Sequence, residues 1–142
     1  MSQNLILVPV FIQVMLTVAV LILLGRARGS SMRERGQSLD DVALAKGPDW
    51  NEQARKVANN LANQFELPVL FYVVCAFALI TRTVDGVMVG AASVFVLSRI
   101  VHAMIHIGPN KVAWRGSVWL VGLVMLVVLW VLVMLRAVLG VA

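Results

Sequence analysis

The chain has little charge, one cysteine and two histidines. Charged residues make up 13% of its 142 residues, and Asp and Glu together number seven. A single cysteine excludes a disulfide within the chain and leaves the redox compartment open. Cys75 lies in an apolar stretch, which favours a small packing residue over a reactive thiol. Internal repeats and low-complexity tracts are also absent from the sequence.

Apolar residues dominate instead. They account for 61% of the chain, and the mean hydropathy is +0.91, values typical of a membrane protein. The first apolar run lacks a small-residue cleavage site, so we interpret it as a retained helix rather than a signal peptide. We predict an all-α, integral membrane four-helix bundle forming a single domain over residues 1–142. Its expected segments are helices at about 5–24, 50–80, 84–107 and 118–139, and a cytoplasmic loop at about 25–49.

The cations are distributed unevenly between the two ends of these helices. Of the twelve Lys and Arg residues, nine lie between the first and second helices or between the third and fourth, against Arg82 and Arg136 on the other side. The positive-inside rule then places both termini outside the cytoplasm. The net charge of +5 therefore reports topology and attraction to anionic lipid. No basic patch interleaved with aromatic residues indicates nucleic-acid binding.

The second helix is longer than a bilayer requires. Asp49 and Glu52 resemble a capping box that would start the helix near Trp50. From there to residue 80 is about 45 Å at 1.5 Å per residue, so the helix should project into the cytoplasm. Pro68 should kink it. The preceding loop has one stretch with helical character, at residues 39–45.

Polar residues recur at helical spacing on the second and third helices, which is costly inside a bilayer and usually marks function. The stripe on the second helix consists of Arg55, Asn59, Asn63 and Glu66, and that on the third of Phe95, Arg99, His102 and His106. Both lie toward the cytoplasmic ends of their helices. We therefore predict a cationic, amide-rich cleft between helices near the cytoplasmic surface.

These residues also allow simpler interpretations. Glu66 and Arg99 could form a buried ion pair that fixes the helix register. His102 and His106 have the i, i+4 spacing of metal ligands, but the residues between them include no glutamate and no third ligand is evident, so we predict no metal site. Arg26 and its neighbours could serve only as a topology signal and headgroup anchor.

Two motifs resemble the MAPEG family, the membrane-associated proteins in eicosanoid and glutathione metabolism. Asn63-Gln64-Phe65-Glu66 with Pro68 downstream is similar to the family's Asn-x-x-Glu and following proline. Arg99-x-x-His102 is similar to its Arg-x-x-His on the third helix, and Arg115 to its arginine before the fourth. Four helices and a long basic first loop extend the resemblance over most of the chain.

The resemblance implies a homotrimer that binds glutathione between subunits and acts on a lipophilic small-molecule substrate. It implies that Arg115 is the catalytic, thiolate-stabilising residue and that Arg26 is a carboxylate clamp from the adjacent subunit. The glutathione contacts or their supports would be Asn63, Glu66, Arg99, His102 and His106. The chain is most similar to a divergent bacterial-type member, which implies a bacterial inner membrane.

Two functional classes stay open from the sequence. The first is a glutathione transferase or peroxidase, in which an arginine favours the thiolate of a tripeptide thiol. The second is a non-catalytic lipid-binding or scaffold protein of the same fold. It is suggested by Asn59 and Ala62, which stand where glutathione-using relatives usually carry arginines. Transport is disfavoured because neither half of the chain is duplicated.

Overall fold

The structure, a computed structural model, describes residues 2–43 and 50–140, and every regular element in these ranges is helical. The elements are the 3-10 helix η1 (Gln3–Ile6) and the α-helices α1 (Leu7–Arg35), α2 (Leu39–Ala43), α3 (Glu52–Asn63), α4 (Leu67–Ile80), α5 (Gly86–Ile107) and α6 (Val112–Leu139). Four segments of this part of the chain are long and apolar enough to cross a bilayer, namely Gln3–Arg35, Glu52–Ile80, Gly86–Ile107 and Val112–Leu139. The chain is a multi-pass integral membrane protein.

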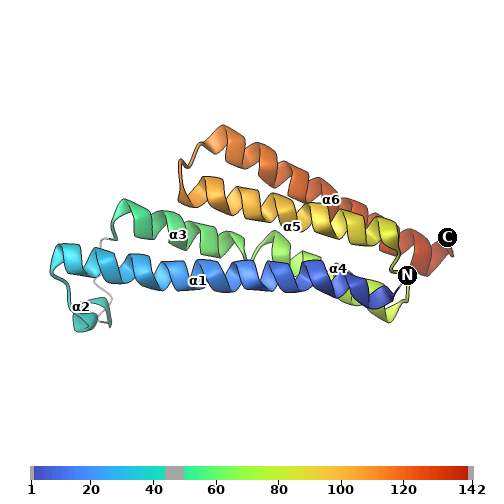
Figure 1. Cartoon of the computed structure of the whole chain (residues 1–142), viewed down its shortest axis with the longest axis horizontal. Coiled ribbons are helices and arrows are strands. Elements are labelled where there is room, and N and C mark those ends of the chain that lie inside the picture. Colours follow the sequence, from blue (N-terminus) through green and yellow to red (C-terminus); the bar gives the residue numbers. More distant parts are fainter. Residues whose placement is uncertain (1, 44–49, 141–142) are drawn as a thin grey trace.

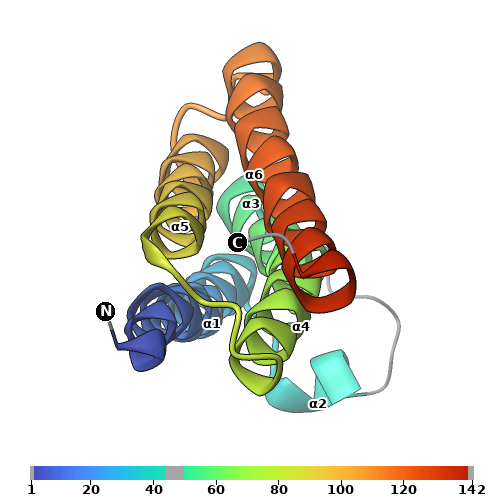
Figure 2. The same ribbon diagram turned by 90° about the vertical axis from the view of Figure 1, so that its right-hand side faces the viewer.

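The long helices run side by side, and the turns between them gather at two ends (Figure 1). The N-terminus, the end of α6 and the α4–α5 turn lie at one end of the bundle, which we call the terminal end. The α5–α6 turn and α2 lie at the other, the turn end. Viewed from the terminal end, α5 and α6 form one pair and α1 packs beside α3 and α4 (Figure 2). Both termini therefore lie at the terminal end of the bundle, as an even number of spans requires.

The first helix is longer than predicted. It continues from the apolar segment through Arg35 and stops at Gly36, whose φ of +62° is the left-handed conformation that glycine adopts at helix ends. Its polar extension packs on α3, because the hydroxyl of Ser31 accepts the Asn51 backbone N–H at 2.9 Å. The prediction of a loop from residue 25 was wrong because the apolar run ends there but the helix does not. The helical stretch expected at residues 39–45 is observed as α2 over Leu39–Ala43, the residues after it lying outside the described part.

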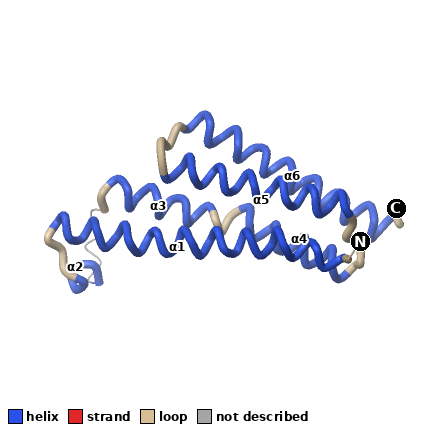
Figure 3. The backbone as a smooth tube through the Cα atoms, viewed as in Figure 1, coloured by secondary structure: helices blue, strands red, loops and turns tan. Residues whose placement is uncertain are grey.

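The second spanning segment is two helices rather than one kinked helix. The backbone leaves the helical path at residues 64–66, between α3 and α4 (Figure 3), and Pro68 stands near the start of α4. Proline has no N–H to bond the carbonyl of Gln64, which favours a break here. The N-cap of α3 is Asn51, whose side chain accepts from the Ala54 N–H at 2.9 Å. The cap predicted at Asp49 lies outside the described residues.

The ends of α5 and α6 also differ from the predicted ranges. Asp85 caps α5 by accepting the Met88 N–H at 2.9 Å, so the helix begins at Gly86. The helix α6 begins at Val112 rather than near residue 118. Arg115 is therefore in the first turn of α6 and not in the loop before it. As for α1, the apolar run predicted only the most hydrophobic part of the helix, and the helix itself extends beyond that run.

The interior changes character along the bundle. Toward the terminal end, α4, α5 and α6 share an apolar core in which the rings of Phe71 and Phe95 stack at 4.4 Å. A smaller apolar cluster joins α1 to α3 at Val20, Leu24 and Val57. Along α5, the buried residues change from apolar ones, ending at Val96, to a set that is mostly polar. This second set begins the candidate site.

Candidate functional site

One face of α5 carries three buried ionisable side chains. Arg99, His102 and His106 follow Phe95 at intervals of three or four residues, and all four are buried. Arg99 has an exposed fraction of 0%. The stripe predicted on the third spanning helix therefore lies on one face and points into the bundle. At bilayer depth such groups need polar partners.

The two histidines connect α5 to α3 and α6. The side-chain amide of Asn63 meets His106 Nδ1 at 3.3 Å, so this nitrogen accepts. His102 Nδ1 lies 3.2 Å from the backbone carbonyl of Arg115 and must donate to it. A neutral His102 then carries its proton on Nδ1, and Nε2 is left as an acceptor that is buried without a partner. The two rings meet edge to face at 5.6 Å.

Arg115 is held in place by the α5–α6 turn. Its Nη1 donates to Asn110 Oδ1 at 2.8 Å, and Asn110 itself adopts a positive φ of 50°. No other hydrogen bond joins the Arg115 guanidinium to the described residues. Arg115 is half-buried at the turn end of the bundle and packs beside His102 through its backbone. It can therefore present N–H donors to a ligand while its position is fixed.

The guanidinium of Arg99 finds no hydrogen-bond acceptor among the described residues. Nε, Nη1 and Nη2 are all buried without a hydrogen-bond partner in the described chain. The side chain lies against α6 at Gly122, where an added Cβ would stand 3.6 Å from Arg99 Cδ and 2.7 Å from Ser98 Oγ. A buried group left unsatisfied in this way destabilises the fold by about 1–3 kcal/mol, and more when it is charged. Arg99 is thus a buried cation whose hydrogen-bond donors are unsatisfied in the described part of the chain.

The predicted ion pair between Glu66 and Arg99 is not formed. Glu66 is exposed and the Arg99 nitrogens have no hydrogen-bond partner, although the two charges still interact electrostatically without direct contact. The cause is the orientation of α3, which buries Ala54, Val57 and Asn60 and exposes Arg55 and Asn59. Arg55 and Asn59 of this stripe therefore face outward, and Glu66, in the break after α3, is also exposed, whereas the stripe on α5 faces inward. Among the described residues, the one hydrogen bond between the two stripes joins Asn63 to His106.

Arg26 also lies on the outside. It is exposed on α1, and within the described residues it makes no hydrogen bond or ion pair. Its neighbour Arg28 lies over the Trp50 ring at 5.2 Å, and Lys111 lies over Trp114 at 4.7 Å near the same end of the bundle. These cation–π pairs are typical of a membrane interface. Arg26 makes no hydrogen bond to the site residues of α5.

A buried chain of side-chain amides escaped the sequence analysis. Gln13 Nε2 donates to Gln64 Oε1 at 2.9 Å, and Gln64 Nε2 donates to Asn60 Oδ1 at 3.2 Å. All three side chains are buried. The available signal was Gln13, which with Thr17 is the polar exception in the apolar run of residues 5–24. Asn60 was missed because it adjoins the predicted stripe rather than belonging to it.

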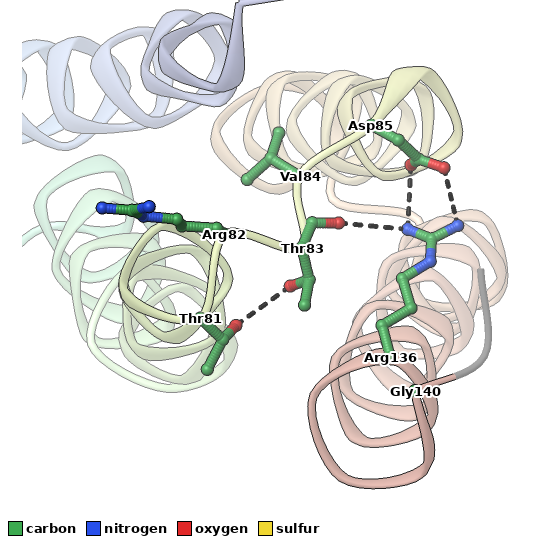
Figure 4. Close-up of a pocket in the computed structure, with 7 residues that line it drawn as sticks. All are labelled: Thr81, Arg82, Thr83, Val84, Asp85, Arg136 and Gly140. Carbon is green, nitrogen blue, oxygen red and sulfur yellow. Dashed lines mark hydrogen bonds and ion pairs between the residues drawn. The ribbon is translucent and has the colours of Figure 1, made fainter.

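The terminal end carries a different polar cluster (Figure 4). Arg136 on α6 forms a bidentate pair with Asp85, at 2.9 and 2.7 Å, and also donates to the Thr83 carbonyl at 3.4 Å. A pocket of about 470 Å³ opens beside this pair. Because the pair already occupies both Nη atoms of Arg136, we interpret the cluster as a structural latch that joins α6 to the α4–α5 turn. In the sequence analysis Arg136 entered only as one of the two cations on the side opposite the basic loops.

Comparison with known proteins gives one result. The family model described as the MAPEG family matches residues 6–135. No curated protein and no solved structure matches the chain. The matched range covers the second and third spanning segments in full and most of the first and fourth, and it includes every residue that the sequence analysis assigned to the site.

Proposed function

Because the chain belongs to the MAPEG family, we propose that it is a membrane-embedded glutathione or similar thiol transferase or peroxidase that acts on lipophilic electrophiles or hydroperoxides. The buried excess of hydrogen-bond donors at Arg99 carries this proposal. Three guanidinium nitrogens without an acceptor favour an anionic ligand with several oxygens, and glutathione has two carboxylates. Its thiolate would supply the nucleophile or the reducing electrons.

Arg115 is the proposed catalytic residue. A free thiol with a pKa near 8.5 is mostly protonated at neutral pH, and a nearby arginine favours the thiolate. The hydrogen bond to Asn110 orients the guanidinium before a ligand arrives, so little reorganisation is needed during the reaction. Asn63, His102 and His106 would orient or support the bound tripeptide on the same side of the bundle.

The outward-facing residues support a site completed by a second subunit. Glu66 lies 14 residues, or about 21 Å, before the end of α4, which places it within a hydrocarbon layer about 30 Å thick. An exposed carboxylate at that depth is unfavourable unless protein or ligand covers it. A homotrimer would cover the face formed by Arg55, Asn59 and Glu66, and would bring Arg26 of one copy to the site of another.

The test is direct binding and turnover with the purified full-length protein in nanodiscs. We expect saturable glutathione binding by calorimetry and conjugation of glutathione to a chlorinated nitrobenzene above the uncatalysed rate. Arg82→Ala, at the terminal end, is the matched control and should retain both. If neither binding nor conjugation nor hydroperoxide reduction is detected, the proposal fails. The lipid-binding alternative would then predict retention of anionic lipid through extraction and purification.

A further inference from the structure

Gln13 has no assigned role, yet it is one of the most deeply buried polar residues of the bundle. Its exposed fraction is 0%, while its neighbours Phe11 and Met15 are exposed on the outside of the bundle. An amide inside a bilayer is unfavourable unless it is hydrogen-bonded. Its Nε2 meets this requirement by donating to Gln64, 51 residues later in the chain, whereas its Oε1 is buried without a hydrogen-bond partner in the described structure.

That partner is the first residue of the break between α3 and α4. Gln64 uses both polar atoms of its side chain, accepting from Gln13 and donating to Asn60. The break cannot simply close into a helix, because Pro68 lacks the N–H that the Gln64 carbonyl would need. The end of the break at Glu66 has φ −98° and ψ −106°, outside the helical region. Gln64 is therefore the point at which the break is attached to α1.

The two residues beside this attachment are both proposed ligand residues. Asn63 immediately precedes Gln64 and contacts His106, whereas Glu66 follows it by two residues and faces outward. A change in the backbone at Gln64 would change the direction of both side chains. Side chains near a ligand must be held within about 0.5 Å of their productive positions to be effective.

We propose that Gln13 is a positioning residue that fixes the α3–α4 break through Gln64 and thereby sets the directions of Asn63 and Glu66. The inference rests on the proposed glutathione site for its functional consequence. Gln13 itself touches neither Asn63 nor Glu66 through any hydrogen bond of the described structure, and it acts through the amide chain.

The test variant is Gln13→Met in the full-length protein, because methionine keeps the length of the side chain and removes the amide. We expect glutathione binding to weaken about tenfold, equivalent to about 1.4 kcal/mol. The fold-increase in KM should exceed the fold-decrease in kcat, because Arg115, the proposed catalytic residue, is not attached to the break. Amides of residues 64–67 should exchange hydrogen faster. In Gln13→Met/Gln64→Met, binding should be no weaker than in Gln64→Met alone.

Thr17→Val is the control on the same helix, since the Thr17 hydroxyl bonds the Gln13 backbone carbonyl and the Tyr72 side chain but not the amide chain. It should leave binding and exchange unchanged. A lower melting temperature for Gln13→Met with unchanged glutathione affinity would overturn the proposal, because a purely structural role predicts that result. If Gln13→Met does not fold, Gln13→Asn, which shortens the amide by one methylene, replaces it with the same expectations.

A readout without ligand separates this proposal from the proposed function. The His106 ring accepts from Asn63, so its side-chain ¹⁵N signals report where Asn63 lies. Gln13→Met should shift these signals and Thr17→Val should not. If the wild-type protein binds no glutathione, the proposed function fails. Unshifted His106 signals and unchanged exchange would instead overturn the role of Gln13, whatever the ligand.

Discussion

Arg136 and Arg99 are two arginines of one bundle with opposite surroundings. Arg136, at the terminal end, is fixed by two bonds to Asp85 and a third to a backbone carbonyl. Arg99, within the polar half, is more deeply buried and has no bonding partner. A satisfied charge contributes to the fold, whereas an unsatisfied one weakens it unless something binds. The comparison separates an end of the molecule whose arginine is paired from a region whose buried arginine has no hydrogen-bond partner in the described chain.

The same contrast extends to the surrounding residues. Toward the terminal end the core is apolar and its aromatic rings stack, so it needs no further partner. In the polar half, His102 Nε2 and Asn60 Nδ2 are also buried without partners. Native proteins leave few such atoms, and each one usually has an explanation. We therefore expect substitutions in the two halves to differ in kind as well as in size.

Arg115→Ala should have the largest effect. An interaction made mainly with the reacting anion appears in the rate, so we expect kcat to fall about 10²- to 10³-fold while glutathione binding changes little. Arg26→Ala should instead raise the KM for glutathione and leave kcat nearly unchanged. Steady-state conjugation kinetics in nanodiscs measure both. Equal losses of binding and turnover in the two variants would contradict the assigned roles.

Arg99→Met should raise the stability of the ligand-free protein and abolish glutathione binding. Replacing buried, unsatisfied donors by an apolar side chain of similar length should stabilise the fold by about 1–3 kcal/mol. Thermal unfolding in detergent, paired with calorimetric binding, measures the two effects. A clear loss of stability without ligand would show that Arg99 has a structural partner and would break the comparison.

Arg136→Met should act in the opposite direction. It removes a bidentate pair, but the Asp85 side chain is 44% exposed and solvent can compensate for part of the loss. We expect a destabilisation of about 1 kcal/mol with glutathione affinity unchanged. A double-mutant cycle with Asp85→Asn should recover most of this as coupling. Additive effects of the two changes would show that the latch contributes little.

Acid should weaken the latch by a smaller amount. Partial burial raises the pKa of Asp85, but the hydrogen bond from the Met88 N–H and the Arg136 guanidinium outweigh it and hold the pKa below its usual value. A lowered pKa in the folded state means that this stabilisation is present above about pH 4 and is lost as the pH falls through the folded pKa. We expect less than about 1 kcal/mol, since the pair is partly exposed.

The measurement is the melting temperature from pH 7 to pH 3 for the wild type and Asp85→Asn. The difference between the two proteins should shrink as the pH falls, and high salt should reduce it at every pH. A difference that is constant with pH would show that Asp85 contributes through its cap of α5 rather than through its charge.

The sequence predicted which residues share a helix face, but not whether that face points into or out of the bundle. Arg99, His102 and His106 were predicted on one stripe and lie on one buried face of α5. The stripe of Glu66 was also predicted, yet it faces outward. In water, the apolar side of a helix identifies the interior. In a bilayer, lipid is as apolar as a core, so polarity cannot tell an interior face from one that meets another subunit.

By itself, the sequence determined four spanning segments, a distortion of the second near Pro68, and the family to which the chain belongs, because length, hydropathy and local spacing are sufficient for each. Only the tertiary structure decided that Arg99 is unpaired, that Arg136 meets Asp85, and that Gln13 holds Gln64. These outcomes depend on contacts between residues at least 51 positions apart in the sequence, or on how one helix is rotated relative to another. Nothing in the local pattern of a single helix specifies either.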